Sequence, residues 1–117
     1  MIYSELKQYE EADRAFKKAI SLDPDDLCAY EQSGRMYYDE GKYQESIAAF
    51  NQASRLTPRA TTYHFLGNAH VHLGEFNEAV HVYRQALQTN PDYEPAYCEL
   101  GAAYYRLQRY KEAADCF

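Results

Sequence analysis

Apolar and aromatic residues recur along this chain at the spacing of amphipathic helices, separated by short polar connections. In Leu27–Glu40 they stand at Tyr30, Met36 and Tyr37, close to one face of a helix. Gly41 follows directly, and glycine is common where a helix ends in a residue with positive φ. The pattern therefore predicts a helix over this segment.

The same reasoning predicts seven helices and no strand. One helix precedes Leu27, and the others are Leu27–Glu40, Tyr43–Thr57, Thr61–Leu73, Phe76–Thr89, Glu94–Leu107 and Tyr110–Phe117. Asp25 and Asp92 are candidate N-caps of the helices that follow them. Thr61 or Thr62 is the candidate N-cap of the helix that starts near residue 61. Connections of two to five residues predict that neighbouring helices run antiparallel.

Two unrelated residue types share one period. Glycines inside the helical pattern are 33 and then 34 residues apart, at Gly34, Gly67 and Gly101. Prolines that follow polar or acidic residues are 34 and then 33 residues apart, at Pro24, Pro58 and Pro91. Such a shared period indicates a structural repeat.

Aromatic and small residues keep the same distance from each glycine. Aromatic residues stand four before it and sixteen after it, at Tyr30, Tyr63, Tyr97, Phe50, Tyr83 and Phe117. The period divides the chain into a partial repeat 1–26, two repeats 27–59 and 60–93, and a partial repeat 94–117. Met1 is then expected in the later half of the first helix of its repeat.

A glycine inside a helix costs about 1 kcal/mol relative to alanine. We interpret the three repeated glycines as points where the backbone of the paired helix approaches closely, facing the small residues Ala53 and Ala86. The residues predicted to be largely buried are Tyr30, Gly34, Phe50, Ala53, Gly67, Tyr83, Ala86 and Gly101.

The columns resemble the tetratricopeptide repeat, whose pattern is W-x2-L-G-x2-Y, then A-x3-F, then A and P. The matching residues of the third unit are Tyr63, Leu66, Gly67, Ala79, Tyr83, Ala86 and Pro91. Tyr replaces Trp throughout, Ser33 stands in a leucine column and His70 in an aromatic column. The resemblance implies an all-α fold, an α-solenoid of antiparallel helix pairs in a right-handed superhelix that binds other proteins.

Composition and charge argue against some classes of binding partner. The chain has 18 acidic and 12 basic residues, a formal charge of −6, and no long basic run, which argues against nucleic acid. No apolar stretch approaches the ~20 residues of a membrane span, so no membrane partner is expected. Cys28, Cys98 and Cys116 form no C-x-x-C pair, which fits a reducing cytoplasm.

The sequence lacks the motifs of common catalytic sites, including G-x-S-x-G and phosphate-binding glycine loops. Neighbouring acidic residues are interpreted as solvated helix faces. His70 and His72 point to different faces of one helix, and His64 lies about 12 Å from His72 along it, so no shared metal is expected. His70 is expected to be a core or half-buried residue. We therefore expect no enzyme activity and no cofactor.

The resemblance implies that the first helix of each pair forms a concave groove, and residues off the packing face are its candidate peptide-binding set. These are Glu31, Arg35, Tyr38, His64, Asn68, His72, Cys98, Tyr105 and Arg106. Aromatic faces with scattered polar groups suit a peptide segment of a protein partner. The carboxylate-binding set of chaperone-binding relatives is absent, and only Asn68 matches the asparagine ladder of the sugar-transferase relatives.

Two alternatives to this protein-interaction scaffold stay open. A self-assembling array would use the end faces, because terminal repeats without a polar capping helix expose apolar surface and favour a homo-oligomer. An accessory segment of a larger enzyme would have its catalytic domain outside this chain.

Overall fold

The computed structural model of the protein describes residues 3–107, with side chains from residue 7 onward. In this range there are six α-helices and no strand. They are α1 Tyr3–Leu22, α2 Leu27–Glu40, α3 Tyr43–Leu56, α4 Ala60–His72, α5 Phe76–Thr89 and α6 Glu94–Arg106. The all-α prediction is confirmed, and the seventh predicted helix, Tyr110–Phe117, lies outside the described residues.

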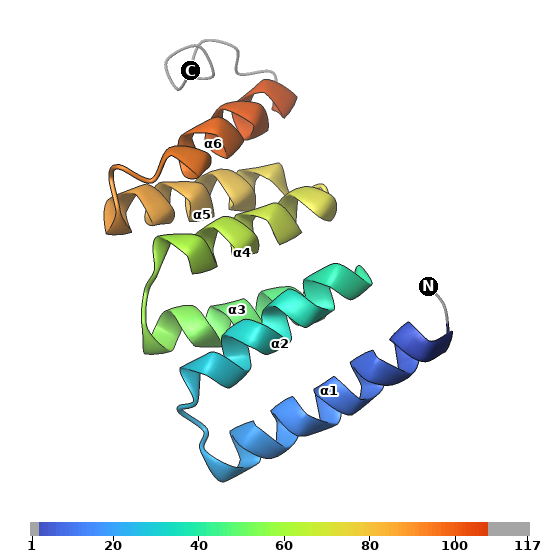
Figure 1. The fold of residues 1–117 in the computed structure, drawn as a ribbon. Helices are drawn as coiled ribbons and strands as arrows, with labels where there is room; N and C mark the ends of the chain where they lie inside the picture. The colour runs from blue at the N-terminus through green and yellow to red at the C-terminus, as the bar shows by residue number, and fades with distance from the viewer. Residues whose placement is uncertain (1–2, 108–117) are drawn as a thin grey trace.

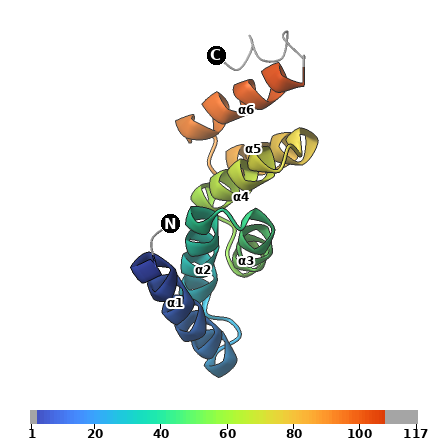
Figure 2. The same ribbon diagram turned by 90° about the vertical axis from the view of Figure 1, so that its right-hand side faces the viewer.

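The helices stack as antiparallel pairs, α2 with α3 and α4 with α5, into an α-solenoid (Figure 1). Turning the stack by 90° shows the pairs following one another along its length (Figure 2). The radius of gyration is 15.4 Å, larger than the ~13 Å of a compact domain near this size. The repeat architecture expected from the sequence is therefore confirmed.

Glycines in the left-handed region separate the helices of a pair. Gly41 ends α2 with φ 80°, and Gly74 follows α4 with φ 76°, a conformation that costs glycine little. Lys7 stands at the matching place of the first repeat, and α1 runs through it without a turn. In the described residues one helix therefore precedes Leu27, as predicted, and no glycine divides it into two.

The predicted helix caps are wrong. Asp26, not Asp25, caps α2, and its Oδ1 accepts a hydrogen bond of 3.1 Å from the backbone N–H of Ala29. The caps of α4 and α6 are Arg59 and Tyr93, neither of which makes a side-chain capping bond. Helix starts depend on where the preceding turn closes, and residue type alone does not determine that position.

Two of the repeated glycines, Gly34 and Gly67, make room for an aromatic ring of the paired helix. A Cβ added to Gly34 would lie 2.9 Å from the Phe50 ring, and one added to Gly67 would overlap the Tyr83 ring. These rings are 1% and 0% exposed. The interpretation that the glycines admit the partner's backbone is wrong: a ring fills the space that the missing side chain leaves.

Seven of the eight residues predicted to be buried are buried: Gly34, Phe50, Ala53, Gly67, Tyr83, Ala86 and Gly101. Tyr30 is only half-buried, which corrects the prediction. Its ring borders an open cavity between α1 and α3, whose Cα atoms do not approach within 8 Å of each other. The repeat identifies Tyr30 as a packing residue, but its neighbours on this side stand apart.

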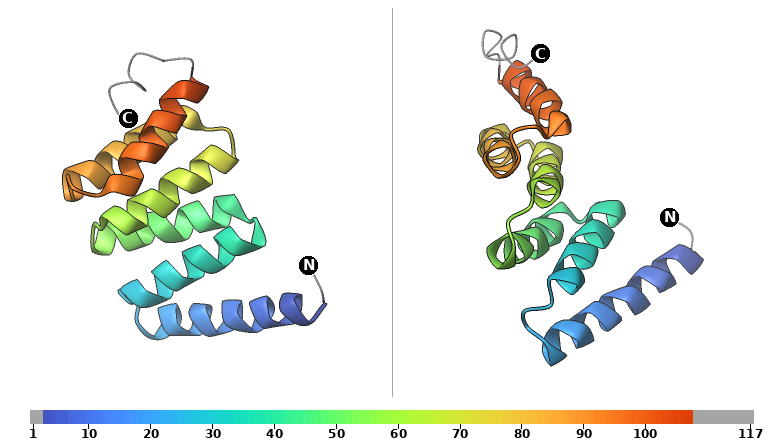
Figure 3. Two further views of the ribbon diagram at one scale, coloured as in Figure 1. Left: turned by 45° about the horizontal axis from the view of Figure 1, so that its top comes forward. Right: turned by 60° about the vertical axis from the view of Figure 1, so that its left-hand side comes forward.

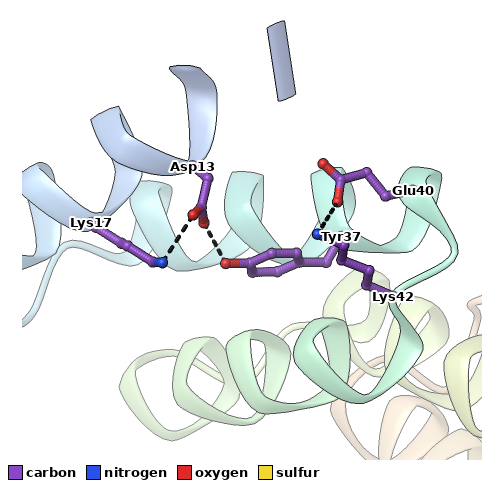
Figure 4. Close-up of polar contacts among 5 residues, drawn as sticks. All are labelled: Asp13, Lys17, Tyr37, Glu40 and Lys42. Atoms are coloured by element: carbon purple, nitrogen blue, oxygen red, sulfur yellow. Dashed lines mark hydrogen bonds and ion pairs between the residues drawn. The ribbon is translucent and has the colours of Figure 1, made fainter. Parts of the chain in front are cut away.

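A polar cluster joins α1 to α2 (Figure 4). The Tyr37 hydroxyl donates a hydrogen bond to the Asp13 carboxylate, which also pairs with Lys17 at 2.9 Å. Burial alone would raise the pKa of Asp13, but the bonds from Tyr37 and Lys17 hold it below its usual value. Burial and the Asp13 carboxylate raise the pKa of Tyr37 to about 12. The neutral tyrosine thus remains the donor.

The glycine–ring contact predicts the effect of a single methyl group. Gly67→Ala should destabilise the fold by about 1–3 kcal/mol, since the Tyr83 ring is fully buried and has no room to shift. Helix propensity alone predicts the opposite, a gain of about 1 kcal/mol. Urea unfolding of this variant, beside Gln88→Ala on an exposed face of α5, decides between the two.

The contact is tested further by adding Tyr83→Leu to the glycine variant. The smaller side chain should recover part of the loss, so that the two changes together cost less than their separate effects added. Strictly additive effects would show that the ring is not what the glycine accommodates.

Candidate functional site: the first-helix wall

The nine candidate residues lie on the first helix of each repeat, on a surface that we call the first-helix wall. Glu31, Arg35 and Tyr38 lie on α2, His64, Asn68 and His72 on α4, and Cys98, Tyr105 and Arg106 on α6. The helices are consecutive along the stack, because α4 contacts both α2 and α6. Figure 3 shows α3 and α5 toward the other side of the solenoid.

An aromatic cluster joins the C-terminal ends of α2 and α4. The Tyr38 hydroxyl lies 3.0 Å from His72 Nε2, and the His72 ring stacks on Tyr43 at 4.5 Å with 1° between the planes. The Tyr38 ring also makes edge contacts with Tyr43 at 5.4 Å and with Phe65 at 6.1 Å. Tyr38 and His72 are therefore brought together, and they link one repeat to the next.

The equivalent contact recurs one repeat later with different chemistry. Arg106 of α6 lies over the Phe76 ring, 5.5 Å from its centroid. Phe76 opens α5 as Tyr43 opens α3, so each time a first-helix residue covers the aromatic residue that starts the preceding second helix. Tyr43 and Phe76 are 33 residues apart, the period of the repeat. This spacing could have identified both residues, which the predicted site did not include.

The N-terminal side of the wall is also joined between repeats. Glu31 accepts a hydrogen bond of 3.2 Å from the Thr62 hydroxyl and pairs with Arg59 at 3.6 Å. At the matching place of the next repeat, His64 Nδ1 lies 3.1 Å from the Tyr93 hydroxyl. Residues Arg59, Thr62 and Tyr93 were not predicted, because their adjacency depends on how successive pairs stack.

Asn68 has a partner beneath the wall. The Tyr83 hydroxyl donates a hydrogen bond of 2.5 Å to its side-chain oxygen, and burial raises the pKa of Tyr83 above its usual value. The amide oxygen of Asn68 is thereby held by the ring that fills the Gly67 position. Its NH₂ group remains as the polar function that Asn68 offers at the surface.

A hollow of about 250 Å³ lies between α2 and α4. Phe50 and Phe65 stack at 5.7 Å in its lining, and the Arg35 guanidinium lies 5.1 Å from the Phe65 ring centroid. Arg59 and Glu31 border the same hollow. An aromatic floor with cationic and anionic groups at the rim provides both an apolar contact and hydrogen bonds for a ligand.

The other candidate residues lie nearer solvent. Cys98 is exposed and forms no disulfide, and the Tyr105 side chain is 60% exposed on α6. Outside the wall, His70 is half-buried as expected, and its Nδ1 lies 2.9 Å from the Glu75 carboxylate. In the described residues no group of three or more His, Cys, Asp or Glu side chains has the arrangement of a metal site.

Family models of tetratricopeptide repeats match most of the chain. One, described as a TPR repeat, matches residues 34–66 and 67–108, and a second, described as a tetratricopeptide repeat, matches residues 1–26. The chain belongs to the tetratricopeptide repeat family. The paired helices, with a glycine of one helix facing a ring of the other, are thus the form that the tetratricopeptide repeat takes in this chain.

The sequence relatives are much longer proteins that contain tetratricopeptide repeats. A probable UDP-N-acetylglucosamine–peptide N-acetylglucosaminyltransferase SPINDLY of Hordeum vulgare is 28% identical over 110 residues, with 87% of this chain and 12% of the relative covered. The human protein O-mannosyl-transferase TMTC2 is 27% identical, with 92% and 15% covered. The chain therefore spans less than a sixth of the length of these two relatives.

Solved tetratricopeptide structures share the fold. A crystal structure of MamA has a TM-score of 0.87 at 26% identity, with 99% of this chain and 71% of that chain covered. YrrB, a TPR protein with an unusual peptide-binding site, has a TM-score of 0.83 at 24% identity, with 97% and 59% covered. None of the described helices of the present chain is long and apolar enough to cross a membrane.

We expect His64, which contacts Tyr93 of the next repeat, to make the stability of the fold depend on pH. Burial lowers its pKa, although the nearby Glu99 carboxylate acts in the opposite direction, and its Nε2 is buried without a hydrogen-bond partner in the described structure. Because the folded state disfavours the protonated ring, stability should fall as pH drops below the unfolded value of about 6.5.

We expect His64→Gln to weaken this dependence. Urea unfolding midpoints measured at about pH 7.5 and about pH 5.5 should fall less for the variant than for the native chain. His81→Gln, at an exposed histidine of α5, is the matched control and should behave as the native chain. Equal falls in the native chain and the His64 variant would contradict the assignment.

Proposed function

We propose that the chain is a protein-interaction module that binds a peptide segment of a partner along the first-helix wall, its concave groove. The hollow between α2 and α4 is the observation that carries this proposal. There, exposed Arg35 lies over Phe65, and the apolar lining is open to a ligand side chain. Membership of the tetratricopeptide repeat family supports binding, rather than catalysis, as the role of this segment.

The contacts of the wall suggest how it holds a peptide. Tyr38 with His72, and His64 with Tyr93, are tied across repeats before any ligand arrives. Such groups lose little further side-chain entropy on binding, so the wall is preorganised. Arg35 and Tyr105, which extend further into solvent, are the proposed anchors for the peptide.

Two other roles are supported by particular observations. Leu22 is 74% exposed at the end of α1 and Tyr97 is 39% exposed on α6, which favours a self-assembling array that uses its ends. The two transferase relatives favour an accessory segment of a larger enzyme. In that role the same wall would hold a protein near a catalytic domain outside this chain.

The groove is tested with peptides selected on the intact chain from a random 12-residue display library. Arg35→Ala and Tyr105→Ala should each weaken binding at least about fivefold, close to 1 kcal/mol, in fluorescence anisotropy titrations. Arg55→Ala on α3 and Tyr97→Ala on α6 are matched controls away from the wall and should leave binding unchanged.

If the selected peptides bind both wall variants as tightly as the native chain, the binding site does not lie on the first-helix wall. Sedimentation of the native chain over a hundredfold range of concentration separates the assembly role. A species whose mass grows with concentration, with no selected peptide retained, would favour the array over the groove.

A further inference from the structure

The second helices of successive repeats stand apart and leave a groove on the other side of the solenoid. No Cα atom of α3 lies within 8 Å of one in α5, although α4 contacts both helices. The space between them is a cavity of about 410 Å³. Tyr63 and Leu66 of α4 line its floor, and Val82 of α5 contributes a buried apolar wall. This α3–α5 groove shares no lining residue with the hollow beside Arg35.

Three side-chain amides border the α3–α5 groove: Asn51 from α3, and Asn77 and Gln85 from α5. None of these side-chain amides hydrogen-bonds to another described residue; Asn51 and Gln85 accept from the Ser54 and Thr89 hydroxyls through their main-chain oxygens. Each side-chain amide carries two donors and an acceptor with two lone pairs. This contrasts with Asn68, whose amide oxygen already accepts from Tyr83.

The charges around the groove are few. Among the described residues that line it, Glu78 is the only one with a carboxylate, and none is a lysine or arginine. His70 borders it but already contacts Glu75, and His81 is exposed at the rim. The chain as a whole carries −6, whereas this surface offers mostly neutral hydrogen-bonding groups above an apolar floor.

We propose that the α3–α5 groove is a second peptide-binding site, which takes an extended polypeptide segment by its main chain and one apolar side chain. Amides that both donate and accept match the N–H and C=O groups of an extended chain. A helical peptide satisfies most of those groups internally and offers them no partner. The apolar side chain packs on Leu66 and Val82, where contact with water is lost.

The neighbouring repeat contains a natural comparison. An equivalent cavity of about 330 Å³ lies between α1 and α3, which also stand apart. Tyr30 and Gln52 occupy the places of Tyr63 and Gln85, but Lys17 replaces Asn51 and no residue of the asparagine type lines it. The open geometry is thus shared by two repeats, whereas of these two cavities the α3–α5 groove alone has the set of three amides.

The test uses the neutral peptide acetyl-Ser-Leu-Ser N-methylamide and the full ¹⁵N-labelled chain in NMR titrations. Saturable shifts are expected for the side-chain amides of Asn51, Asn77 and Gln85 and for the backbone of Leu66. The combined variant Asn77→Ala, Gln85→Ala should raise the Kd at least tenfold. Gln44→Ala with Gln88→Ala is the matched control, because both glutamines are exposed outside the cavity.

Two further measurements separate main-chain recognition from other binding. Methylating the leucine nitrogen of the peptide removes one N–H donor and should raise the Kd at least tenfold. Changing the salt from about 0.05 to about 0.5 M should change the Kd less than twofold, since no ion pair forms. Circular dichroism of the double variant shows that its fold is retained, as expected for substitutions at the rim.

Saturable shifts confined to the first-helix wall around Arg35 and Tyr105 would overturn the second site and leave the proposed concave groove in place. Absence of any saturable shift at Asn51, Asn77 and Gln85 would equally overturn it. Shifts of the Asn51 side-chain amide and the Leu66 backbone that saturate at an unchanged Kd in the double variant would show that the other two amides do not hold the peptide, and would overturn the mechanism of recognition.

Discussion

The contact between a glycine and an aromatic ring sets the geometry on which the rest of the solenoid depends. Phe50 and Tyr83 occupy the space that a side chain at Gly34 or Gly67 would fill, so each helix pair closes around a ring. Burying a large apolar side chain contributes about 1.5–3 kcal/mol, which offsets the ~1 kcal/mol cost of the glycine. Polar bonds fix the same point: the Ser46 hydroxyl donates to the Gly34 carbonyl at 2.8 Å.

The pair geometry makes the two sides of the solenoid chemically different. First helices contact one another along the stack, whereas α3 and α5 do not. On the first-helix wall, polar residues therefore reach partners in the next repeat, as Glu31 reaches Thr62 and His64 reaches Tyr93. On the other side the gap is too wide for such bonds, so amides remain available above an apolar floor.

The sequence predicts the helices and their pairing because these depend on residues that recur with the period. Gly41 and Gly74 mark helix ends, and the aromatic columns mark the core. It does not predict contacts between repeats, since these depend on the stacking angle as well as on residue type. Tyr43 and His72 are each visible in the sequence, yet only the folded chain places their rings 4.5 Å apart. Tyr30 is half-buried for the same reason, since its exposure depends on how far α1 stands from α3.

One place in the repeat accommodates different chemistry without changing the backbone. His72 stacks on Tyr43 through its imidazole ring, whereas Arg106 lies over Phe76 as a permanent cation. In both arrangements the side chain covers the aromatic residue that starts a second helix. Packing at this place therefore requires a flat or cationic group that can lie against the face of a ring. This requirement does not determine the charge of the side chain. A wall built on this rule differs in charge from repeat to repeat while the glycine–ring contact beneath it stays the same, and in the proposed peptide-binding role this difference is available for selecting a partner.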